Sequence, residues 1–116
     1  MKLNNILFLL FLSLGLNAEK SDKLDSVKTN LQAIFLIKKI KNNNIDDKFV
    51  VLLDKVSKNA QLLKYNVIEN LGKYLKKIME KAEQNNQKLY DKLFESYMVL
   101  EYNFEGRNWK TGLSGF

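Results

Sequence analysis

A stripe of apolar residues between Phe49 and Ala82 constrains the fold of this chain more than any other feature. Its members follow one another in steps of three and four: Phe49, Leu53, Val56, Ala60, Leu63, Val67, Leu71, Leu75, Ile78 and Ala82. Steps of this size place all of them on one side of an α-helix. Because Asp46 or Asp47 can cap such a helix, we expect it to run from about residue 47 to about residue 84.

Two features predict a kink or interruption of this helix near residues 70–73. Gly72 is less favourable than alanine inside a helix by roughly 1 kcal/mol. The stripe also takes an additional step of four from Val67 to Leu71, which shifts its phase just before that glycine.

A shorter helix is expected before the stripe, over residues 21–41, followed by a loop at residues 42–44. Its apolar residues begin with a three-four-three spacing: Leu24, Val27, Leu31 and Ile34. Residues 33–37 are then apolar on every side of the helix. A helix of this kind has to be buried on several sides, so we expect a core segment, with a partner-binding patch as the alternative.

A third helix is expected after a turn at residues 85–87. One line on it comprises Leu89, Leu93, Tyr97, Leu100 and Phe104, and a second line alongside comprises Tyr90, Phe94 and Met98. We assign this aromatic face mainly to the core, with a binding groove or membrane-interface surface as the alternative. The tail, residues 105–116, contains three glycines, so we expect it to be non-helical and either docked or flexible.

These patterns predict an all-α fold, either a small helical bundle or a hairpin, with one long, kinked central helix. At 116 residues the chain is short enough for one helical domain, over residues 19–104. Apolar residues make up 46% of the sequence, which supplies a modest core, and there is no proline to interrupt helices. The same stripe can pack within one chain or pair with a second copy, so homo-oligomers stay open.

The first eighteen residues are typical of a signal peptide. Lys2 precedes an apolar run over residues 6–16, which is about half the length that a membrane-spanning helix needs. Cleavage after Ala18 would release the chain to the periplasm or cell envelope; retention of residues 1–18 as an anchor is the alternative. The chain has no cysteine, so we expect neither a lipid anchor nor disulfides.

The composition argues against an enzyme. Histidine and cysteine are both absent, which excludes the usual zinc ligand sets and nucleophiles activated by histidine. Glycine loops for phosphate and acidic loops for calcium are absent as well. We therefore expect no catalytic residue, cofactor or metal site.

A candidate basic surface lies on the second half of the stripe helix. The formal net charge of the chain is +6, and four lysines gather within about two turns: Lys73, Lys76, Lys77 and Lys81. Export and the near absence of arginine argue against nucleic acid as the partner. The remaining interpretations are a contact with a membrane surface, a contact with another protein (a second copy or a membrane-active peptide), and a solvated helix face.

The overall character of the chain resembles the BlyB family of haemolysin accessory proteins of Borrelia. The resemblance rests on residues 1–5 with the apolar run after them, the exit at Ala18 without a cysteine, the helical body rich in Lys and Asn, and the length. It covers the whole chain without a diagnostic motif, and no functional residue is carried over. It implies a prophage-associated protein that stabilises or modulates a small, hydrophobic, membrane-active partner, a BlyA-like holin.

The leading hypothesis is thus a non-enzymatic accessory protein of a holin or haemolysin system. Its candidate partner-binding stripe consists of Phe49, Leu53, Val56, Leu63, Val67, Leu71, Leu75 and Ile78. The alternative is an exported or surface-displayed helical adhesin that binds a host ligand.

Overall fold

The computed structural model describes residues 17–114, with side chains for residues 23–107, and this part of the chain is all-α. It contains four helices and one short 3₁₀ turn: α2 (Asn17–Lys41), α3 (Asp47–Lys58), η1 (Ala60–Leu62), α4 (Tyr65–Asn85) and α5 (Gln87–Ser114). The predicted all-α bundle is confirmed. The predicted signal peptide lies outside the described residues except for its last two positions, which begin α2.

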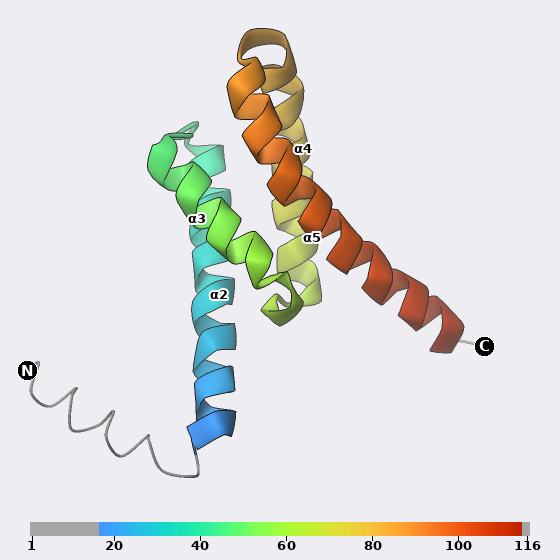
Figure 1. Ribbon diagram of the computed structural model, residues 1–116. Helices are drawn as coiled ribbons and strands as arrows, with labels where there is room; N and C mark the ends of the chain where they lie inside the picture. The colour runs from blue at the N-terminus through green and yellow to red at the C-terminus, as the bar shows by residue number, and fades with distance from the viewer. Residues whose placement is uncertain (1–16, 115–116) are drawn as a thin grey trace, which may run out of the picture.

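Each helix runs antiparallel to the one before it in the chain (Figure 1). α4 packs on α5 and on α2, while α3 packs on α2 and on α5. The four helices therefore form a ring in which α2 and α5 are diagonal to each other, as are α3 and α4. The bundle is flat, with principal extents of 51 × 45 × 20 Å.

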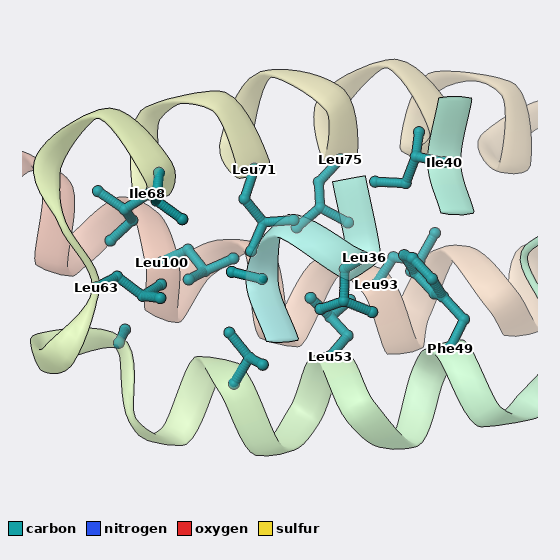
Figure 2. Packing of buried hydrophobic residues seen from close by; sticks show 14 of the residues in the cluster. Leu36, Ile40, Phe49, Leu53, Leu63, Ile68, Leu71, Leu75, Leu93 and Leu100 are labelled. Carbon is teal, nitrogen blue, oxygen red and sulfur yellow. The ribbon is translucent and has the colours of Figure 1, made fainter. Parts of the chain in front are cut away.

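All four helices contribute side chains to one core (Figure 2). Leu36 of α2, Leu53 of α3, Leu71 of α4 and Leu93 of α5 are all fully buried. Each buried leucine contributes roughly 1.5–3 kcal/mol by leaving water. Since every helix supplies such residues, no helix is dispensable for the core.

The loop between α2 and α3 forms as the sequence predicts. Asn43 adopts a left-handed backbone conformation with φ of 58°, which asparagine tolerates better than most residues. Asp46 then caps α3, because its Oδ1 accepts a hydrogen bond of 2.8 Å from the backbone N–H of Phe49. Lys39 Nζ lies 3.6 Å from the same carboxylate oxygen and ties α2 to the cap.

The predicted position of the break in the long helix is wrong. The chain leaves the helical path at residues 59–64, between α3 and α4, and there it reverses direction. Gly72 lies inside α4, and the helix continues through it. Ala60 and Leu63 are buried although they lie in the reversal, so the apolar spacing continues unchanged across it and conceals it.

Side chains from two distant helices, α2 and α5, satisfy the backbone of this reversal. Asn30 of α2 donates from its side-chain nitrogen to the Leu62 carbonyl at 3.0 Å and accepts from the Lys64 N–H at 2.8 Å. Arg107 of α5 donates to the carbonyls of Leu63 at 2.6 Å and of Ala60 at 2.9 Å. These contacts replace the helical hydrogen bonds that the reversal removes.

The expected non-helical tail is also corrected, because α5 continues to Ser114. Gly106 lies within this helix, one residue before Arg107. The Arg107 contacts with the reversal give this stretch a tertiary anchor, which outweighs a local glycine cost of about 1 kcal/mol. The side chains of residues 108–116 lie outside the described residues.

The reversal predicts a large effect for Asn30→Ala. This change leaves the Lys64 N–H without its side-chain partner and removes one of the two side-chain donors to the Leu62 carbonyl, so we expect a loss of roughly 1–3 kcal/mol in the free energy of unfolding. Urea denaturation measures it. Asn70→Ala, at an exposed position of α4, is the matched control and should change stability by less than about 0.5 kcal/mol. Equal effects of the two changes would contradict the role of Asn30.

Gly72→Ala separates an unbroken α4 from a kinked one. A methyl group at this position meets no heavy atom within 4 Å. In a continuous helix the change should therefore raise the free energy of unfolding by roughly 0.5–1 kcal/mol. Thermal and urea unfolding of the two proteins give the comparison. A loss of stability would mean that the backbone at Gly72 needs a conformation that only glycine adopts easily.

Candidate functional site

The predicted partner-binding stripe lies inside the bundle. Seven of its eight residues are buried, namely Phe49, Leu53, Val56, Leu63, Val67, Leu71 and Leu75, while Ile78 is partly buried and packs against them. The other helices of the same chain cover this stripe. It is therefore the intramolecular core, and a partner surface has to be sought elsewhere on the molecule.

The four lysines of the candidate basic surface are exposed on α4, and their neighbours differ. Lys73 and Lys76 line the side that borders α5. Lys77 instead lies beside the Tyr74 ring, with its Nζ at 5.5 Å from the ring centroid. Lys81 lines a hollow with residues of the loop after α2. Helical spacing keeps these lysines next to one another on the exposed side of α4, so the basic surface stays a prediction.

The side of α4 that carries Lys77 gains a lysine that sequence spacing could not indicate. Lys41, at the end of α2, places its Nζ 5.3 Å from the centroid of the same Tyr74 ring. One aromatic ring thus attracts two cations, an arrangement worth roughly 0.5–1 kcal/mol per contact at an exposed site.

A shallow groove of about 250 Å³ separates α4 from α5 at Gly72. Lys73 and Lys76 line it together with two carboxylates, Glu69 and Glu101. Because charges of both signs are present in equal number, the groove does not select an anion or a cation. Its volume is also small for an organic ligand.

The outer side of α2 is apolar, and the described part of the chain leaves it uncovered. Its exposed members are Leu24, Val27, Leu31, Ile34 and Phe35, each at least half exposed. The core is formed by the opposite side of the helix, through Ala33, Leu36 and Ile40. The all-round apolar segment, residues 33–37, is thus divided between the core and the surface. We call the exposed set the α2 outer face.

A second uncovered apolar surface lies on α5. The predicted core line is confirmed, because Leu93 and Leu100 are buried and Leu89, Tyr97 and Phe104 pack against the core. The residues alongside are different: Phe94, Met98 and Tyr102 are 42%, 48% and 81% exposed. We call these three residues the α5 ridge.

The α5 ridge is bordered by acidic residues. Asp91 and Glu95 lie one helical turn before Phe94 and Met98, and Glu105 lies one turn after Tyr102. All three acids are exposed. The ring of Phe94 also stacks on Tyr90, with centroids 5.9 Å apart, which fixes one end of the ridge.

Two further classes of site are missing from the part of the chain that the structure describes. No group of three or more acidic, histidine or cysteine side chains lies close enough together to hold a metal ion. No described helix is long and apolar enough to cross a membrane.

Comparison with known proteins adds no relative: the chain matches no family model, no curated protein and no solved structure. The α2 outer face and the α5 ridge are accordingly the candidate functional surfaces, on geometry alone. Most of their residues stand out in the sequence, where a contact surface is predicted only as the alternative to the core for residues 33–37 and for the aromatic face of the third helix. Spacing shows that residues share a face, but it does not show which face is covered.

Tyr97, on the wall of the α4–α5 groove, predicts a pH effect. Burial raises its pKa from 10.0 to about 12, aided by the hydrogen bond of 3.0 Å that its hydroxyl donates to Glu101. Since the folded pKa exceeds the unfolded one, the stabilising contribution is complete below about pH 10 and is lost as the pH rises toward 12. Tyrosinate absorbance, compared between the wild type and Tyr97→Phe, should show one tyrosine with a delayed titration that the variant lacks. A Tyr97 that titrates with the remaining tyrosines would contradict this environment.

Proposed function

We propose that this protein is an exported, non-enzymatic accessory protein that binds an amphipathic helix of a small, membrane-active protein on its α5 ridge. The observation that carries the proposal is an exposed aromatic and methionine surface with a border of carboxylates. The stripe between Phe49 and Ile78 does not carry it, because that stripe forms the core.

The side chains of the ridge suit an apolar helix face. Phe94 and Tyr102 present large, stiff surfaces, and Met98 is flexible enough to fit partners of different shape. An amphipathic helix contacts such a surface through residues at i, i+3, i+4 and i+7. The ridge therefore offers apolar area to a helix rather than a pocket to a small ligand.

The acidic border selects the charge of the partner. Membrane-active amphipathic helices are commonly rich in Lys and Arg on their polar face. Asp91, Glu95 and Glu105 lie where such residues would meet them when the apolar faces are in contact. From Asp91 to Glu105 the surface is about 21 Å long, or roughly four helical turns, which suits a short partner helix.

The resemblance to the BlyB family is compatible with this proposal, as is the apolar run over residues 6–16 that we interpret as an export signal. A protein that covers the apolar face of a lytic helix would limit the contact of that helix with lipid. Covering that apolar face would then both stabilise a BlyA-like partner and modulate its activity on the membrane.

The test is co-expression with a BlyA-like protein, followed by pull-down and measurement of the half-life of that partner. The wild type should retain the partner and prolong its half-life. Met98→Gln with Tyr102→Gln removes exposed apolar area, and Asp91→Lys with Glu95→Lys reverses the border; each pair should weaken retention by at least about tenfold. Val51→Gln, at a 70% exposed position of α3, is the matched control and should retain binding.

Failure of the wild type to bind, with an unchanged half-life of the partner, would remove the proposal. Binding that survives both double changes would place the partner on a different surface. Circular dichroism shows whether each variant keeps its helical content.

A further inference from the structure

The α2 outer face is apolar over three turns and is left free by the rest of the described chain. Leu24, Val27, Leu31 and Phe35 are exposed by 58%, 57%, 60% and 51% and line one shallow, open depression. At 1.5 Å per residue this surface is about 16 Å long. A contiguous exposed apolar strip of this kind is a candidate contact surface.

The charged residues near this face are almost all lysines. Residues 23–41 hold five lysines, at 23, 28, 38, 39 and 41, and one acid, Asp25, which gives a local excess of 5 − 1 = +4. Helical spacing places Lys28 beside Leu24 and Leu31, and Lys38 beside Ile34. Lys39 Nζ lies 5.5 Å from the Phe35 ring centroid. The apolar strip therefore has cations along its length.

We propose that the α2 outer face binds the surface of an anionic lipid bilayer. The apolar strip would enter the boundary between headgroups and acyl chains, with the helix axis parallel to the membrane. Lys23, Lys28 and Lys38 would reach lipid phosphates, since the aliphatic part of a lysine can lie along apolar surface while its ammonium group stays in the polar layer. Each lysine near an anionic surface strengthens binding by about fivefold.

Two observations favour a bilayer over a second α2 outer face as the occupant. Pairing two copies through this face would bring lysines against lysines, and like charges in contact oppose association. An anionic membrane instead supplies negative charge along the full length of the strip.

The α5 ridge of another copy is the remaining occupant with matching charge, and it would give head-to-tail association of the chain. It differs from a bilayer in a measurable way, because it makes the mass in solution depend on protein concentration.

The membrane proposal is independent of the proposed function, which uses the α5 ridge. The two experiments change different helices. Lipid binding can therefore fail while partner capture succeeds, and partner capture can fail while lipid binding succeeds.

The experiment is co-sedimentation of the full chain with vesicles of phosphatidylglycerol and phosphatidylcholine, compared with vesicles of phosphatidylcholine alone. Binding to the anionic vesicles should be at least about tenfold stronger and should weaken at high salt. Leu31→Gln with Phe35→Gln, and separately Lys28→Glu with Lys38→Glu, should each lower the partition coefficient at least about tenfold. All four side chains are largely outside the core, so the fold should persist in both variants.

Matched controls use exposed positions on α3: Val51→Gln for the apolar change, and Lys48→Glu with Lys55→Glu for the charge change. Lys48→Glu with Lys55→Glu on α3 should lower the partition coefficient less than half as much as Lys28→Glu with Lys38→Glu does on α2. Equal losses from the two lysine pairs would overturn the proposal, because net charge alone would then explain binding.

Vesicle binding that is indifferent to lipid charge and to the α2 variants would also overturn the proposal, because the binding would then belong to residues outside this face. Sedimentation velocity without lipid provides the last check. A concentration-dependent mass that the α2 variants abolish, without lipid binding by the wild type, would assign the face to the α5 ridge of a second copy.

Discussion

The chain reversal between α3 and α4 is the constraint on which the rest of the bundle depends. Where two helices are broken apart, carbonyls and N–H groups lose their helical partners, and each unpaired group that stays buried costs about 1–3 kcal/mol. Asn30 and Arg107 supply the partners, from α2 on one side and α5 on the other. The reversal therefore also fixes how α2 and α5 sit against the α3–α4 connection.

The same contacts decide which side of α2 faces inward. Both sides of this helix are apolar, so hydrophobicity alone does not choose between them. Asn30 and Ser26 lie on the inner side, and both donate to the Leu62 carbonyl. A rotation that buried Leu24, Val27 and Leu31 would remove these hydrogen bonds and turn Asn30 away from the reversal. The hydrogen bonds of Ser26 and Asn30, rather than the apolar area of either side, thus decide that the α2 outer face stays exposed.

The sequence predicts the features that depend on residues near one another in the chain. It does not predict the features that depend on a side chain from a distant helix. The Asp46 cap, the loop at residues 42–44 and the line from Leu89 to Phe104 all follow from neighbours in the chain. The reversal at residues 59–64 contains neither glycine nor proline, and its partners lie 34 and 44 residues away. Gly72 and Gly106 pointed to breaks that do not occur, because packing and the Arg107 contacts outweigh a helix cost of about 1 kcal/mol each. For a related reason, contact surfaces on these helices are predicted from the sequence only as alternatives to the core: periodicity identifies faces, but only the assembled bundle shows which are covered.

The two exposed faces differ in the charge that borders them, and the two proposals assign them separate partners on this difference. The α2 outer face is bordered by lysines and the α5 ridge by carboxylates, so each face opposes pairing with its own copy. Because α2 and α5 are diagonal in the ring, their outward surfaces point in different directions. A molecule that lay on an anionic bilayer through α2 would then hold its α5 ridge clear of the lipid. A cationic amphipathic helix bound there would have its apolar face covered close to the membrane, but not within it. Together the two proposals describe a protein that meets a membrane-active helix at the bilayer surface and keeps it from inserting.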